Sequence, residues 1–299
     1  EPRGMLMLEE NLIEVGAGIA IAAGVSHASY LSARDVCKLR FDEGMRTAPT
    51  LDGEIDAPLR ADIGSFQSRV YDFGKTVVGS LILEIHEARG GEIVDTFHFE
   101  RLDPTTLEAI YVPDSHSRVA LGSRLVCRVG RQQHQFYHAF GFRYVIITVR
   151  DAPEGIRVKP RLRTTLYPLV AKGSFLSSER DLNQIWSACA WTQRCCSLDA
   201  FVDTPWREQA QWWGDARIQA ENAFFLSDDV ALLKRGIAQI ASQTTDNLTF
   251  GHAPTMAQGC VLPDFTLIWI LTIWDYYWQT GCLDLFLKHK NGIFDALSY

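Results

Sequence analysis

One short segment, residues 201–215, gathers the side chains of this sequence that are best suited to chemistry. It contains the carboxylates Asp203, Glu208 and Asp215, together with Arg207 and three tryptophans. Carboxylates can act as general acids and bases, and indole faces stack on the apolar C–H faces of a pyranose ring. A planar guanidinium can orient a carboxylate or bind ring hydroxyls. These residue types together are typical of a site that hydrolyses sugars.

The same segment also fits an ordinary helix start. Asp203 or Thr204 would cap the helix, Pro205 would occupy its first turn, and Glu208 would face the positive end of the helix. The tryptophans would then be core residues. Residue types alone do not decide between the two interpretations, so the elements that surround the segment matter.

Residues from about 66 to 170 have the pattern of short β-strands. A run at Leu81–Ile85 is followed by Arg89-Gly90-Gly91 and then by Ile93–Phe99, which predicts a hairpin with a glycine turn. Further runs of the same type are Val77–Val78, Leu125–Val129, Tyr144–Val149 and Arg161–Leu166. Several antiparallel strands at such spacing favour a β-sandwich of jelly-roll type.

After about residue 175 the apolar period changes to that of helices. A stripe begins after Ser178 and consists of Leu182, Ile185, Trp186, Cys189 and Ala190. Helices are also predicted at 215–226, 229–243, 263–280 and 282–290, and no segment of this half has a strand pattern. The helix at 263–280 is apolar nearly all round, so we expect it to be buried, with Trp274 and Trp278 in the core.

These patterns predict three regions. Residues 1–65 form an N-terminal segment, read as the end of an upstream β domain. Residues 66–172 form the β-sandwich, and residues 173–299 form an incomplete helical domain.

Composition narrows the classes of function. The chain has 299 residues, is 47% hydrophobic and carries a net charge of -7, which suits a globular protein and disfavours binding to nucleic acid. Its seven cysteines show neither a disulfide framework nor zinc spacing, so we expect no metal and no cofactor. The apolar segment 12–24 is too short to span a membrane, and a cytoplasmic location is favoured.

The pattern Asp203-x-x-x-Arg207-Glu208-x-x-x-Trp212-x-Gly214-Asp215 resembles the signature of the bacterial α-L-rhamnosidases, glycoside hydrolase family 78. Other parts of the chain are similar to the same family in the same order. These are Tyr71–Lys75 with Val78-Gly79, Gly141–Tyr144, Gly173–Phe175 with Asp181–Trp186, and Pro263–Trp269. The resemblance covers roughly residues 70 to 285.

The resemblance implies an (α/α)6 six-hairpin barrel that releases terminal α-L-rhamnose from a glycoside or oligosaccharide by an inverting mechanism. Glu208 matches the general acid of the family. Asp203, Arg207, Trp212 and Asp215 match substrate-binding positions of the family. Trp213, Asp264 and Trp269 are further candidates for substrate binding. Trp213 stands at a position that varies in the family, so the resemblance assigns it no definite role. For Asp264 a first-turn carboxylate after Pro263 is an equally good interpretation, and Trp269 on an apolar helix fits a core role better. His252 lies in a glycine-containing connector and is expected to be an exposed loop residue.

An inverting enzyme also needs a general base. In the resembled family that glutamate lies far downstream of the acid, so we expect it beyond residue 299. A twelve-helix barrel also exceeds the five or so helices of residues 178–299. We therefore expect these residues to belong to a longer enzyme, to be poorly active alone and to tend to associate. The alternatives are another six-hairpin glycosidase or a non-catalytic carbohydrate-binding protein.

Overall fold

The computed structural model describes residues 5–25, 50–51, 55–107, 109–110, 121–254 and 260–299. The chain divides into two compact units. One is Glu10–Thr165, and the other combines Glu1–Glu9 with Leu166–Tyr299. Within the described parts of the chain, no helix is both long enough and apolar enough to cross a membrane.

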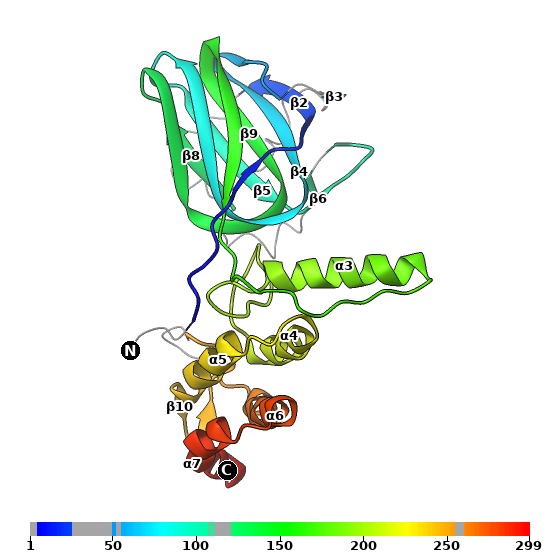
Figure 1. Ribbon diagram of the computed structural model, residues 1–299. Helices are drawn as coiled ribbons and strands as arrows, with labels where there is room; N and C mark the ends of the chain where they lie inside the picture. Colours follow the sequence, from blue (N-terminus) through cyan, green and yellow to red (C-terminus); the bar gives the residue numbers. More distant parts are fainter. Residues whose placement is uncertain (1–4, 26–49, 52–54, 108, 111–120, 255–259) are drawn as a thin grey trace. The chain divides into compact units, whose positions relative to one another are not determined.

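The first unit is built from β-strands (Figure 1). They are β1 Leu12–Glu14, β2 Ala17–Val25, β3 Thr50–Leu51, β4 Leu59–Ala88, β5 Ile93–Phe99, β6 Arg101–Leu102, β7 Ala109–Ile110, β8 Gly122–Val126 and β9 Gly130–Thr164. Seven of these strands are joined in the order β3-β2-β4-β9-β5-β8, with β1 on a further edge of β9. β6 and β7 form a separate pair.

The long strand β4 pairs with three separate stretches of β9. Residues 66–72 of β4 pair with 144–150 of β9, and the register shifts between Asp72 and Val77. Beyond that shift, residues 79–85 pair with a second and a third stretch of β9. Strands that change layer through such irregularities are typical of sandwiches. The predicted antiparallel sandwich is confirmed.

The predicted hairpin between Leu81–Ile85 and Ile93–Phe99 is wrong. Ile82 lies opposite both Gln135 and Arg161 of β9, so both hydrogen-bonding edges of this part of β4 are occupied. β5 instead pairs with β8 and β9. The turn after β4 therefore leads to a different part of the sheet, and a glycine turn between two strand patterns does not identify the partner strand.

The sandwich buries a cluster of charged groups. The Asp95 carboxylate accepts hydrogen bonds from Arg124 Nε at 2.6 Å and from Arg150 Nε at 2.9 Å. Asp95 and Arg150 are each only 2% exposed. His98 is also buried, with Nδ1 3.0 Å from the Leu121 carbonyl oxygen, and its burial lowers its pKa from 6.5 to about 4.

The second unit is helical (Figure 1). It contains α3 Arg180–Cys195, α4 Trp213–Leu226, α5 Ala231–Ala241, β10 Thr244–Thr245, β11 Leu248–Thr249, α6 Pro263–Thr280 and α7 Asp284–Leu297. All five helices were expected, and α6 starts at Pro263 and ends at Gly281 in the left-handed conformation that favours glycine. The two-residue strands β10 and β11, which pair with each other, were not expected.

The N-terminal segment differs from its prediction. β1 and β2 pair with β9 and β4, so they belong to the sandwich itself and not to an upstream domain. The units divide between Thr165 and Leu166, slightly before the predicted boundary at 172. The part of the segment at 26–49 lies outside the described residues.

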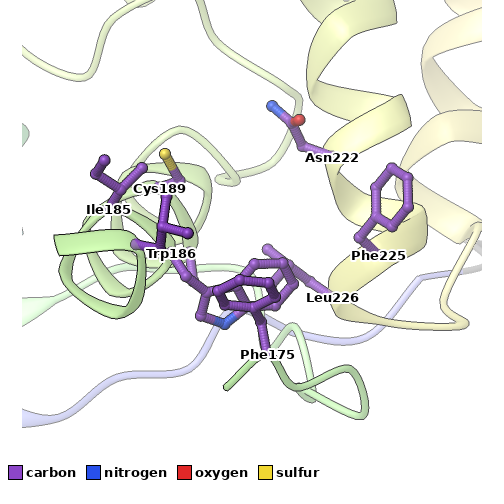
Figure 2. A pocket seen from close by; sticks show the side chains of 9 residues that line it. Phe175, Ile185, Trp186, Cys189, Asn222, Phe225 and Leu226 are labelled. Atoms are coloured by element: carbon purple, nitrogen blue, oxygen red, sulfur yellow. The ribbon is translucent and has the colours of Figure 1, made fainter. Parts of the chain in front are cut away.

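The helical unit leaves large apolar side chains exposed. Ile185 of the α3 stripe is 58% exposed, and Trp274 and Trp278 of α6 are 55% and 73% exposed. The expected core position of these two tryptophans is therefore wrong for residues 1–299, because α6 buries only the opposite side of the helix, at Trp269, Ile273 and Tyr276. The α3 stripe lines a cavity of about 290 Å³. Figure 2 shows Ile185, Trp186 and Cys189 of α3 on one side of this cavity and Asn222 and Phe225 of α4 on the other. Phe175 and Leu226 also line the cavity.

Candidate active site

Residues 203–210 of the carboxylate-rich segment form a closed loop ahead of α4. The Asp203 amide donates to the Ala210 carbonyl oxygen at 2.9 Å, and the Ala210 amide donates back to the Asp203 carboxylate at 2.9 Å. Gln209 and Thr204 close the loop further inside, through an amide-to-carbonyl bond of 3.0 Å. The helix begins only at Trp213. Asp203 therefore fixes a loop, and the interpretation of this segment as a helix start is wrong.

Glu208 is held at both carboxylate oxygens by neighbours within this loop. Trp212 Nε1 donates to Oε1 at 2.8 Å, and an Arg207 guanidinium nitrogen lies 3.0 Å from Oε2. The Glu208 side chain is 32% exposed and that of Arg207 is 38% exposed. The carboxylate is thus oriented by two donors and remains open to a ligand from solvent.

Asp203 and Asp215 complete a cluster of negative charge. Partial burial is the main cause that raises the pKa of Asp203, and the charges of Glu208 and Asp215 raise it further. The backbone amides of Ala210 and Thr204 act in the opposite direction. Asp215 lies in the first turn of α4 and is exposed. The structure therefore brings Glu208 and Asp215 each within electrostatic reach of Asp203.

Two predicted substrate contacts are core residues in the structure. Trp213 is fully buried and Trp269 is 2% exposed, and Trp269 Nε1 donates to the Ile237 carbonyl oxygen at 3.1 Å. Neither indole has a face open to a ligand, because both pack in the hydrophobic core of the helical unit. Both indoles are therefore inaccessible to a sugar in this unit. Asp264 is exposed in the first turn of α6.

Two further residues border the site and were not predicted for it. His252 is 6% exposed and packs against Trp212, so the expectation of an exposed loop histidine is wrong. Gln211 is 5% exposed, and its Nε2 donates to the Ala253 carbonyl oxygen at 3.0 Å. Both contacts join segments about 40 residues apart, and no local pattern in the sequence signals them.

The arrangement provides specific chemistry. An oriented carboxyl group can exchange a proton with a bridging oxygen, and neighbouring carboxylates and a guanidinium can bind hydroxyl groups. A half-buried indole supplies an apolar surface beside them.

Comparisons with known protein families agree with this combination of a β-sandwich and a helical unit. A model of the bacterial alpha-L-rhamnosidase concanavalin-like domain matches residues 65–162. A model of the bacterial alpha-L-rhamnosidase 6 hairpin glycosidase domain matches residues 171–289. The first match falls on the sandwich and the second on the helical unit.

Individual relatives match only with part of their length. An alpha-L-rhamnosidase of Streptomyces avermitilis is 28% identical over 191 residues, which is 62% of this chain and 18% of that protein. The crystal structure of a GH78 family rhamnosidase of Bacillus sp. GL1 has a TM-score of 0.74 at 24% identity, and the match covers 85% of this chain and 27% of that one. A rhamnosidase from Klebsiella oxytoca with rhamnose bound has a TM-score of 0.72 at 16% identity, covering 99% and 57%. The chain thus spans less than two thirds of each of these relatives.

The match of the helical unit to a 6 hairpin glycosidase domain, directly after the sandwich, places the chain in the class of six-hairpin glycosidases. The two consecutive domain matches narrow this class to one family. The chain belongs to the bacterial α-L-rhamnosidases of glycoside hydrolase family 78.

Proposed function

We propose that the protein containing residues 1–299 hydrolyses glycosides and releases terminal α-L-rhamnose with inversion at the anomeric carbon. The observation that carries this proposal is the held carboxylate of Glu208, with Trp212 Nε1 at 2.8 Å and the charges of Asp203 and Asp215 nearby. The substrate class is supported by the family, and by the rhamnose bound to the Klebsiella relative.

In this proposal Glu208 is the general acid. Trp212 and Arg207 only donate hydrogen bonds, so each can contact an oxygen of the carboxylate that remains after the proton has been transferred. Before transfer, Glu208 must carry a proton on one oxygen, and the contact that must open is the half-exposed one to Arg207. A released Arg207 can then bind a hydroxyl group of the sugar.

Asp203 and Asp215 bind rhamnose hydroxyls in this proposal, together with Trp212, and exposed Asp264 is a further candidate. The raised pKa of Asp203 makes this residue the strongest rival for the acid role, since a general acid must be protonated at the working pH. The rival assignment can be tested directly.

The general base is proposed to lie outside residues 1–299. An inverting enzyme needs a second carboxyl group about 6.5–9.5 Å from the acid, so that a water molecule fits between them. This proposal agrees with the short share of each relative that the chain spans.

The decisive experiment compares Glu208→Gln with Asp203→Asn in the natural protein, using aryl rhamnosides with good and poor leaving groups. Glu208→Gln should lower kcat/KM by about 10²–10⁴-fold for poor leaving groups and much less for activated ones. Asp203→Asn should weaken binding of both substrates equally. The reverse pattern would assign the acid to Asp203, and equal losses in Glu208→Gln would remove Glu208 from the acid role.

A panel of other aryl glycosides tests the sugar. Faster turnover of another glycoside than of the rhamnoside would contradict the proposed substrate. Proton NMR of the first product formed tests inversion, since an inverting enzyme releases β-L-rhamnose before mutarotation. Initial release of the α-anomer would contradict the mechanism.

A further inference from the structure

The Trp212 indole, whose Nε1 donates to Glu208, is itself held in place by neighbouring rings. The His252 ring lies edge-on to it with ring centroids 4.6 Å apart at 75°, and Phe265 lies 6.2 Å away at 88°. Trp212 and His252 also face each other in an antiparallel bridge. The indole is therefore fixed both by its backbone and by perpendicular rings, which is a favoured geometry for aromatic pairs.

His252 is in turn fixed by its own connector. Its Nδ1 lies 3.2 Å from the Pro254 carbonyl oxygen, and a carbonyl only accepts, so Nδ1 carries the hydrogen. A Cβ at Gly251 would lie 3.0 Å from Leu262 Cδ1 and 3.3 Å from Trp212 Cζ3. Glycine at 251 thus lets this connector approach the indole closely enough for the ring contact.

We propose that His252 is a positioning residue, whose ring holds the Trp212 indole so that Nε1–H stays directed at Glu208 Oε1. The chain of contacts runs from the Pro254 carbonyl through His252 and Trp212 to the carboxylate. The catalytic consequence of this chain rests on the proposed function, whereas the geometric claim can be tested without any activity.

The direct test measures exchange of the Trp212 indole hydrogen with solvent in the ¹⁵N NMR spectrum of residues 1–299. The signal is assigned by its loss in Trp212→Phe. In His252→Ala, exchange of this hydrogen should become about 5-fold faster, since the perpendicular contact that restrains the ring is lost. In His252→Phe the edge-on ring remains, so exchange should stay within about 2-fold of the original protein.

The chain offers a matched control. His289 lies edge-on to Trp269, with ring centroids 5.8 Å apart at 74°, in the same unit. His289→Ala removes the same kind of ring pair and should leave exchange at Trp212 unchanged. An equal acceleration in His289→Ala would show a general loosening of the unit and would overturn the proposal, as would unchanged exchange in His252→Ala.

Should His252→Ala not fold, His252→Leu replaces it, because leucine fills the space without an aromatic ring edge. Exchange should then be faster in His252→Leu than in His252→Phe, and equal rates would overturn the proposal. In the natural protein, His252→Ala should lower kcat for poor leaving groups and leave KM within about 2-fold, with rescue by His252→Phe. Absence of all rhamnosidase activity would contradict the proposed function but would leave the exchange result standing.

Discussion

Carboxylates occupy opposite surroundings in the two units. In the sandwich, Asp95 is 2% exposed and is matched by two guanidinium groups, so its charge is neutralised inside the fold. In the helical unit, Asp203, Glu208 and Asp215 lie together near the guanidinium of Arg207, and they remain partly or largely exposed. Charge balance and access to solvent, more than residue type, therefore separate a structural carboxylate from one available for chemistry.

The units also differ in how they treat apolar surface. The sandwich buries long apolar runs of β4 and β9 in its core. The helical unit exposes Leu267, Leu271, Trp274 and Trp278 along one side of α6. A contiguous apolar surface of this kind is typical of a face that packs against further protein.

Tryptophan makes the two units separately observable. All eight tryptophans lie after residue 185, in the helical unit. Trp fluorescence therefore follows the helical unit, and the β-type circular dichroism signal follows the sandwich.

The largest effect on the free energy of unfolding is expected from Asp95→Ala. It removes the buried carboxylate that Arg124 and Arg150 both bind, so the free energy of unfolding of the sandwich should fall by about 3–5 kcal/mol. Glu208→Gln in the helical unit should change stability by less than about 1 kcal/mol. Urea unfolding followed by the two signals measures both.

The control for Asp95→Ala is Glu10→Ala, which removes an exposed ion pair with Arg163 at 3.5 Å. It should cost less than about 0.5 kcal/mol. A similar loss in Asp95→Ala and Glu10→Ala would contradict the expected difference between buried and exposed carboxylates.

The next largest effect on the free energy of unfolding is expected from lowering the pH. Because burial lowers the pKa of His98 from 6.5 to about 4, the unfolded chain binds a proton that the folded sandwich does not bind. The free energy of unfolding should therefore fall as the pH drops below about 6.5, and the loss should reach about 3 kcal/mol near pH 4.

His98→Phe tests this assignment because it cannot titrate and still packs between Phe140 and Phe142. The difference in pH dependence between the original protein and His98→Phe isolates the contribution of His98. Parallel stability curves between pH 6.5 and 4 would contradict a neutral buried His98.

The smallest effect on the free energy of unfolding is expected on the exposed apolar side of α6. Trp278 is 73% exposed, so Trp278→Lys in residues 1–299 should change the free energy of unfolding by no more than about 0.5 kcal/mol. It should also reduce self-association, as measured by sedimentation velocity. A large loss of stability would show that Trp278 is packed within the unit, and the contrast in apolar surface would then fail.

The parts predictable from the sequence were those with local signals. The change of apolar period separates strands from helices, and Pro263 and Gly281 mark the ends of α6. Glu208, Arg207 and Trp212 are close in sequence, so their contacts follow from one loop. Pairing of β4 with β9 and packing of His252 on Trp212 were not predictable, because each depends on which distant segments share an edge or a face.

The pairing of β1 with β9 sets an order of events during synthesis. Leu12 lies opposite Arg163, so the ribosome must release about 150 further residues before β1 meets its partner. Until then, β1 has an open edge that other chains can pair with. We therefore expect the nascent sandwich to depend on chaperones until Thr164 has emerged, and slower translation just after this residue should improve the yield of folded protein.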